Sequence, residues 1–339
     1  MRRRTLAVTV VGVIAATGVL VAAQARRSAP PAAAGWTVPR LSDGRPDLQG
    51  VWENNSATPL ERPREFANKP RLSDDELEAL KRKAGALFGP EADAVFGDAL
   101  YLALLDETRS RQLGATGTYS ANWLPDRLFE LRTSLIESPV DGRLPPATPE
   151  NAKLRAARAA RAFARPASAS DMTLTDRCIS YGVPDLFAAY MSLYRIVQAP
   201  DVVAIEMEKI HDVRVVPLDS RPRLSAAHRH YMGDARGRWD GDTLVVETAN
   251  FHPSGNYMGG LLRLSDGNLS LTERFTRVAD DTMRYEFTVN DPTVWTAPWT
   301  AVIYWKRAKG EIYEYACHEG NYSLRGMLSG ARADEGAAR

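Results

Sequence analysis

The sequence predicts a mainly β protein with N-terminal helices, an α+β fold built on an antiparallel, calycin-like up-and-down barrel. From about residue 193, short segments in which apolar and polar residues alternate follow one another. Tight turns join these segments, and no helix long enough for a crossover separates them, which disfavours a parallel sheet. The alternative is a half-open twisted antiparallel sheet covered by helices.

Composition and charge limit the function classes. The chain has 339 residues, of which 44% are hydrophobic and 25% charged, as in soluble proteins with a core. Without Arg2, Arg3 and Arg4, the chain carries 40 basic and 42 acidic residues, so nothing suggests nucleic-acid binding and we expect no nucleic-acid partner.

The N-terminus has the pattern of a secretory signal peptide over residues 1–25. Three arginines precede the apolar run Leu6–Val21, and the small-x-small triplet Ala23–Ala25 follows. A membrane anchor is the alternative, but the run of 16 residues is shorter than the roughly 20 needed to span a bilayer. We expect export by the Sec or twin-arginine route to the periplasm or medium, with no stable membrane anchor after cleavage.

The remaining chain divides into a tether, one domain and a tail. Residues 26–35 are rich in Ala and Pro and predict a disordered tether. Residues 36–333 predict a single β-barrel domain with a helical insertion at about 72–165. Residues 334–339 are expected to form a disordered tail.

The helical insertion has recognisable start signals. Ser73 and Glu76 have the spacing of a capping box at the start of one helix. A second helix is expected over residues 92–105. Thr148 before Pro149 predicts the start of a third helix that extends to about residue 165.

The strands are predicted from alternation and turns. Gly50–Trp52, a glycine and a tryptophan at the start of the first strand, is a pattern of lipocalin-type barrels. A further strand is expected at 132–137, between the helices. The later strands are expected at 193–198, 202–207, 213–217 and 243–248, and around 269–275, 283–289, 301–305 and 312–318.

Three segments resemble a family of exported bacterial proteins. They are residues 143–150, residues 237–251 (GRWDGDTLVVETANF) and residues 313–322 (YEYACHEGNY). The resemblance covers about residues 47–333 and implies export and a common fold. It implies no reaction, cofactor or catalytic residue, so a site must be argued from residue chemistry.

Two segments hold candidate catalytic residues. His211 and Asp212 lie at the junction of two predicted strands, with Arg214 as a substrate-binding group that offers a two-pronged donor. On extended backbone Asp212 and Arg214 share one face; a salt bridge at the strand end is the structural alternative. His318 and Glu319 follow the last predicted strand and are candidate general bases in a barrel mouth, or a histidine bonded to a loop carbonyl.

Aromatic side chains are the candidates for an apolar pocket. They are dense around Trp305, and Tyr190 and Tyr257 are expected to join Trp305 in binding a ring-shaped ligand; the rest belong to the core. Cys178 and Cys317 either pair as a disulfide or remain two buried thiols.

We expect no metal and no cofactor. His228 and His230 have a spacing that metal sites use, but they lie in a segment expected to be an exposed basic loop and have no evident third ligand. Nucleotide-binding glycine motifs are absent from the sequence, as is the G-x-S-x-G elbow of serine hydrolases.

The leading hypothesis is an exported enzyme, a lyase, isomerase or hydrolase, that performs cofactor-free acid-base chemistry on a small, largely apolar carbonyl or cyclic compound. The alternative is a periplasmic protein that binds a hydrophobic ligand without catalysis. A third possibility is an envelope protein that acts through an exposed apolar surface. Convergence of His211, Asp212, His318 and Glu319 in one pocket would favour catalysis; scatter of these residues over the surface, with Trp and Tyr side chains lining a dry cavity, would favour binding.

Overall fold

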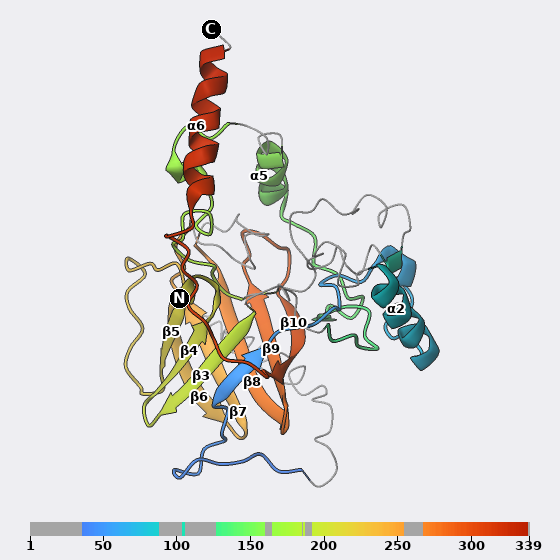
Figure 1. The fold of residues 1–339 in the computed structure, drawn as a ribbon. Coiled ribbons are helices and arrows are strands. Elements are labelled where there is room, and N and C mark those ends of the chain that lie inside the picture. Colours follow the sequence, from blue (N-terminus) through green and yellow to red (C-terminus); the bar gives the residue numbers. More distant parts are fainter. Residues whose placement is uncertain are drawn as a thin grey trace, which may run out of the picture. The chain divides into compact units, whose positions relative to one another are not determined.

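A ten-stranded antiparallel sheet dominates the part of the chain that the structure describes (Figure 1). The computed structural model describes residues 36–87, 104–105, 127–159, 165–184, 186, 192–253 and 267–337. All elements named below belong to one unit, Val38–Arg339. The strands are β1 Gly50–Glu53, β2 Ile136–Ser138, β3 Leu193–Ala199, β4 Val202–Met207, β5 Val213–Pro217, β6 Asp234–Asp240, β7 Thr243–Ala249, β8 Ser270–Ala279, β9 Thr282–Asn290 and β10 Trp299–Arg307.

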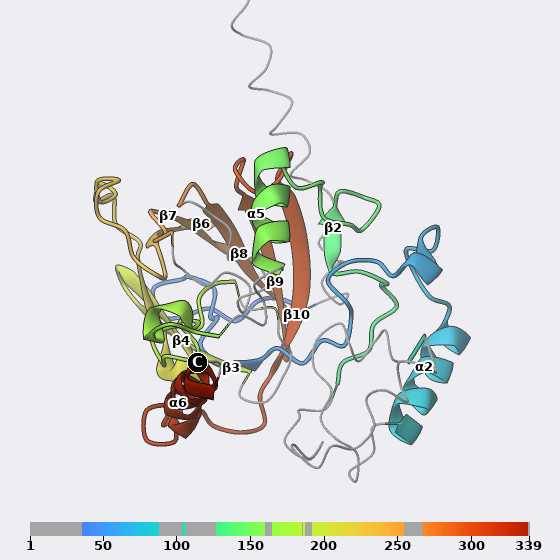
Figure 2. The same cartoon turned by 90° about the horizontal axis from the view of Figure 1, so that it is seen from above.

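The strand order makes a nearly closed, barrel-like sheet. It runs β5-β4-β3-β1-β10-β9-β8-β7-β6, with the short strand β2 also paired to β10. The pairing of the first strand links the two halves, because Trp52 is in register with both Tyr194 of β3 and Arg307 of β10. Figure 2 shows the sheet curving from β4 and β3 through β10 to β8 and β6.

The edge strands β5 and β6 meet at a seam without a hydrogen-bonded ladder among the described strands. One end of the seam is in van der Waals contact, because a Cβ at Gly237 of β6 would lie 2.8 Å from Val216 Cγ1 of β5. At both ends of β5, even-numbered residues bond toward β4: Met207 N donates to Asp212 O, and Leu218 N donates to Asp201 O. By the two-residue period of a strand, the amides of Val213 and Val215 therefore face the seam.

The interior of the sheet is a packed aromatic and aliphatic core. Along β8 every second residue is buried, and the other interior strands show similar alternation. The largest fully buried side chains include Trp52, Trp299, Phe251, Phe275 and Phe287. Burial of such apolar area, at about 25 cal/mol per Å², is the main contribution that stabilises the fold.

Three described α-helices lie outside the sheet: α2 Asp74–Leu87, α5 Pro149–Ala159 and α6 Tyr322–Ala337. The capping box of α2 is formed, since Ser73 N donates to Glu76 Oε2 and Glu76 N donates to Ser73 Oγ. At the start of α5, Asn151 N donates to Thr148 Oγ1 at 3.2 Å.

The predicted antiparallel, barrel-like architecture is confirmed at this coarse level, but an N-terminal block of helices is not supported. One of the three described helices, α6, is at the C-terminal end and was not predicted; it includes residues 334–337, which the sequence analysis assigned to a tail. The alternative prediction, a half-open sheet, applies only to the seam, where the edge strands β5 and β6 form no hydrogen-bonded ladder among the described strands. These two strands nevertheless lie close together.

Two predicted strands differ from the structure, and one strand was missed. Residues 312–318 form no strand, because a turn leads there into α6, and only the end of 132–137 enters β2. Strand β6 was missed because its glycine and charged residues obscure the alternation. Of the helix predicted over 92–105, only residues 104–105 lie within the described residues, and they are helical.

The seam contact predicts a cost for any side chain at residue 237. Gly237→Ala should lower the free energy of unfolding by about 1–3 kcal/mol, because its methyl group overlaps Val216 and Leu218. Gly310→Ala, which meets no atom within 4 Å, is the control and should change it by less than about 0.5 kcal/mol. Urea denaturation measures both, and equal effects would contradict the seam contact.

Candidate functional site

A pocket of about 360 Å³ opens where the seam widens. One wall comes from the start of β5, and the other from residues 230–235, which lead into β6. A third segment, at 179–180, completes the lining. The lining residues are Ile179, Ser180, Asp212, Val213, Arg214, Val215, His230, Tyr231, Met232, Gly233 and Ala235.

Asp212 is the carboxyl group of this pocket. Its Oδ2 accepts hydrogen bonds from Ser180 Oγ at 3.0 Å and from Tyr181 N at 2.7 Å. Burial raises the pKa of Asp212 above its ordinary value, although these hydrogen bonds act in the opposite direction. Asp212 is therefore a partly buried carboxyl group with a raised pKa among the residues that line the pocket.

Arg214, the next inward-facing residue of β5, pairs with Glu273 in the interior of the sheet. Arg214 Nη1 and Nη2 donate to the two carboxylate oxygens of Glu273 at 2.9 and 2.5 Å. Thr248 Oγ1 accepts from Arg214 Nη2 at 3.3 Å, and Tyr285 Oη donates to Glu273 Oε1 at 2.7 Å. Burial alone would lower the pKa of Arg214, but the charge and hydrogen bonds of Glu273 raise it above its ordinary value.

The buried ion pair adjoins an aromatic stack. The ring of Tyr285 lies 4.5 Å from that of Trp305, which stacks on Tyr194 at 4.3 Å, centroid to centroid. Trp305 is thus buried in the core and is not among the residues that line the seam pocket. Arg214 and Glu273 are only 4% and 1% exposed, so the ion pair is shielded from water.

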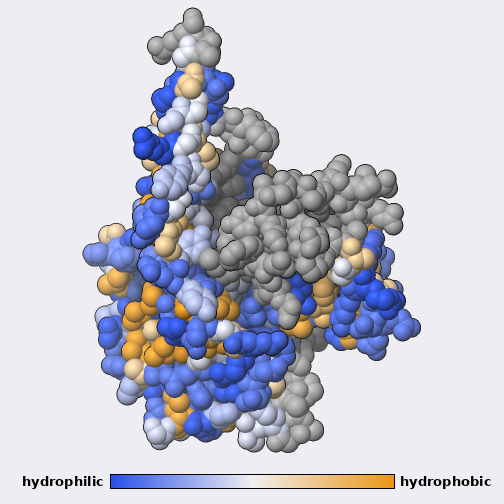
Figure 3. Space-filling view, viewed as in Figure 1, coloured by the Kyte–Doolittle hydropathy of each residue, from blue (hydrophilic) through white to orange (hydrophobic). Residues whose placement is uncertain are grey.

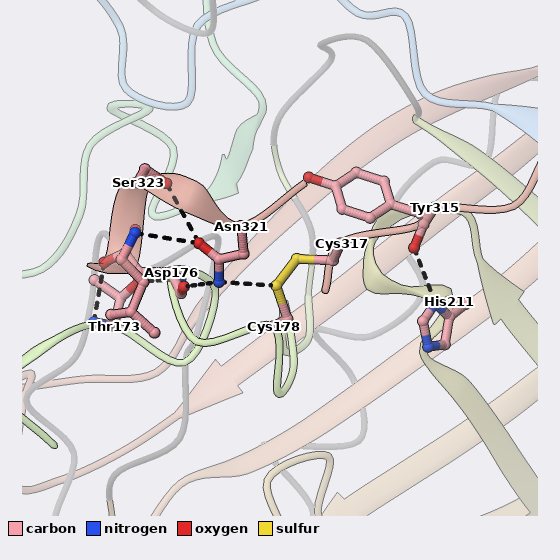
Figure 4. The surroundings of a disulfide bond; sticks show 9 residues. Thr173, Asp176, Cys178, His211, Tyr315, Cys317, Asn321 and Ser323 are labelled. Atoms are coloured by element: carbon pink, nitrogen blue, oxygen red, sulfur yellow. Dashed lines mark hydrogen bonds between the residues drawn. A yellow bond between two sulfur atoms is a disulfide. The ribbon is translucent and has the colours of Figure 1, made fainter. Parts of the chain in front are cut away.

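A disulfide between Cys178 and Cys317 holds the segment that bonds to Asp212 (Figure 4). It joins the 173–182 segment to the chain before α6, and Asn321 Nδ2 donates to the carbonyl of Asp176 beside it. His211 Nδ1 lies 3.2 Å from the carbonyl oxygen of Tyr315 in the same region. Three segments distant in sequence are therefore tied together next to the pocket.

Left-handed backbone conformations gather around the same pocket. Among the described residues, the non-glycine positions with positive φ are Cys178, Ile210, His211 and Asn250. Ile210 and His211 immediately precede Asp212, and Asn250 accepts a backbone hydrogen bond from the lining residue His230. Such conformations are costly for residues with a side chain and tend to occur at functional sites.

The structure brings together only part of the predicted site. Asp212 and Arg214 both line the pocket, but Arg214 pairs with Glu273 and not with Asp212. The side chains of His211, His318 and Glu319 are exposed and do not line it. Tyr190 and Tyr257 lie outside the described residues.

Sequence reasoning missed Ser180, His230 as a lining residue, and Glu273. A signal for Glu273 was present, because it lies on the apolar face that Leu271 and Phe275 define by alternation in β8. A carboxylate at such a position needs a cationic partner. No comparable local signal marks Ser180, whose position depends on the fold around the disulfide.

Comparisons with known proteins do not identify the chain: no protein-family model matches it, and no curated protein matches it either. Among the described residues, no helix combines the length and apolar character needed to cross a bilayer. Within the same ranges, no cluster of three or more His, Cys, Asp and Glu side chains is arranged to hold a metal ion.

Removing one partner of the buried ion pair should strongly destabilise the fold. Arg214→Met or Glu273→Leu should each lower the free energy of unfolding by about 3–5 kcal/mol, because each leaves an unpaired charge in the interior. The double variant should lose less than the sum of the two. Chemical denaturation of all four proteins tests this, and additive losses would contradict a direct pairing.

The raised pKa of Asp212 predicts a pH-dependent stability. Burial disfavours the carboxylate, so stability is lost as the pH rises from the ordinary pKa through the raised one. Relative to Asp212→Asn, the wild-type protein should therefore become less stable across this range. Thermal unfolding between pH 3.5 and 8 gives the comparison.

The control for this prediction is Asp219→Asn. The hydrogen bonds of Arg221 lower the pKa of Asp219, so there the wild-type protein should gain relative stability as pH rises. The same trend in both comparisons would refute the prediction for Asp212.

Proposed function

We propose that this protein is an exported binding protein that holds a small ligand in the seam pocket. The observation that carries this proposal is the pocket itself, between two strand edges that do not pair. The four candidate acid-base residues do not meet there, since Asp212 is the only one of them in the lining. Because three of the four candidate catalytic residues lie outside the pocket lining, a ligand-binding protein is favoured over the acid-base enzyme that the sequence predicts.

The lining suits a small ligand with an apolar body and a polar group. Ile179, Val213 and Met232 supply apolar surface, while Asp212 and Ser180 supply polar atoms. The volume of about 360 Å³ is within the range of small-molecule sites. A small cyclic or carbonyl compound with a polar substituent fits this description.

Export and membership of the calycin class are parts of the same proposal. The pattern of residues 1–25 supports export, and the disulfide agrees with an oxidising compartment. The buried Trp52, with the guanidinium of Arg307 4.7 Å from its ring centroid, supports a calycin-like barrel end. The resemblance to exported bacterial proteins points in the same direction.

A second candidate function is acid-base catalysis by Asp212 on the bound compound. It is favoured by the raised pKa of a carboxyl group that lines a pocket. In that case Asp212→Asn would retain the ligand and abolish its conversion. The binding proposal predicts that the bound compound is recovered chemically unchanged.

Obstruction of the pocket tests the proposal. Native mass spectrometry of protein purified from its own periplasm should show a small bound compound, and Val213→Trp should reduce its occupancy at least 10-fold by filling the mouth of the pocket. Val197→Trp is the matched control, because Val197 and Val213 are similarly exposed but only Val213 lines the pocket.

The two tryptophan variants make the outcome specific to the site. Val197→Trp should retain the bound compound in full. If neither variant lowers its occupancy, or if both lower it equally, the compound binds elsewhere and the proposal is wrong.

A further inference from the structure

The charge of the seam pocket differs from what its sequence suggests. Of the residues that line the pocket, Asp212 is the one with a carboxyl group and Arg214 the one with a guanidinium group. In the sequence they are two positions apart and could form an ion pair, which would leave the pocket without net charge. The structure separates them, because Arg214 turns to the interior and is only 4% exposed.

Arg214 is not available to bind an anion. Its two terminal nitrogens donate to both carboxylate oxygens of Glu273, and Nη2 also reaches Thr248. Its Nε is buried without a hydrogen-bond partner among the described residues, out of reach of solvent. The guanidinium charge is therefore neutralised within the core before any ligand arrives.

Asp212 is left as the uncompensated charge of the lining. Its carboxyl group accepts hydrogen bonds from neutral donors: Ser180 Oγ and Tyr181 N donate to Oδ2, and the backbone of Gly182 also donates. The nearby cation Lys209 lies over the ring of Tyr181, 4.6 Å from its centroid, and does not line the pocket. Asp212 therefore has no guanidinium or ammonium partner among the described residues that line the pocket.

The outer rim reinforces this preference. Exposed apolar side chains border the pocket on β5, where Val213 and Val215 are 54% and 62% exposed, and Figure 3 shows apolar surface over β3–β5. Tyr231 belongs to the opposite wall, and its ring lies 5.0 Å from that of His252, centroid to centroid. An aromatic face and a carboxylate together favour a cation that carries an apolar body.

From these contacts we propose that the seam pocket selects organic amines, that is, small compounds with an apolar body and an ammonium group that donates to the carboxyl group of Asp212. This inference rests on the proposed binding function and names its ligand class. The apolar body lies against Ile179, Val213 and Met232. Carboxylate ligands are rejected, because their charge would face Asp212, and the described lining residues include no lysine and no arginine other than Arg214, which is paired with Glu273.

Three matched probes test the inference on the full mature chain: benzylamine, benzyl alcohol and benzoate, measured by isothermal titration calorimetry at pH 7.5. They share one ring and differ in the charge of the polar group. Benzylamine should bind at least 10-fold more tightly than benzyl alcohol, and benzoate should bind most weakly. This comparison uses the wild-type protein and does not depend on the folding of any variant.

Two variants test whether Asp212 is responsible for the preference for benzylamine. Asp212→Asn should reduce the affinity for benzylamine at least 10-fold and leave that for benzyl alcohol within about twofold, since the amide removes charge and keeps shape. Asp219→Asn, an exposed carboxyl that does not line the pocket, should change neither. Thermal unfolding confirms that each variant is folded.

The outcomes separate the two proposals. If benzoate or benzyl alcohol binds as tightly as benzylamine and Val213→Trp abolishes this binding, the amine inference is overturned and the binding function stands. If no probe shows binding that Val213→Trp removes, both proposals fall. Binding of benzylamine that is insensitive to Asp212→Asn also overturns the inference.

Discussion

The buried pair of Arg214 and Glu273 is the interaction on which the rest of the structure depends. It joins the edge strand β5 to β8 across the interior, where no backbone ladder connects β5 with β6. An ion pair in an apolar interior has a large desolvation cost, so its retention suggests a role beyond stability. Here the ion pair holds β5 in place, while the amides of β5 that face the seam have no ladder partner among the described strands.

The position of the seam explains why the pocket lies between the start of β5 and the residues that lead into β6. The strands are in contact at Gly237, and the segment tied by the Cys178–Cys317 disulfide contributes Ile179 and Ser180 to the pocket lining. Ser180 and Asp212 then meet across the opening. The cost of the left-handed conformations at Ile210 and His211 is offset by the contacts of this corner, including the bond from His211 to the Tyr315 carbonyl.

The sheet was largely predictable from the sequence because alternation is a local property of strands half buried on one face. It located β3, β4 and β5 closely. The same rule was wrong for residues 312–318, where tertiary contacts and the disulfide replace a strand. The site was only half predictable: Asp212 and Arg214 were found by their proximity in sequence, but which partner each takes depends on contacts between distant strands, such as β5 with β8.

Hydrogen exchange at the individual amides of β5 tests the unpaired seam most directly. The account predicts that the amides of Val213 and Val215, which face the seam, exchange at least 100-fold faster than those of Arg214 and Val216, which face β4. Equal protection at all four amides would mean that β5 and β6 pair through a closed ladder. In that case the seam would be closed, and the site described above could not exist as stated.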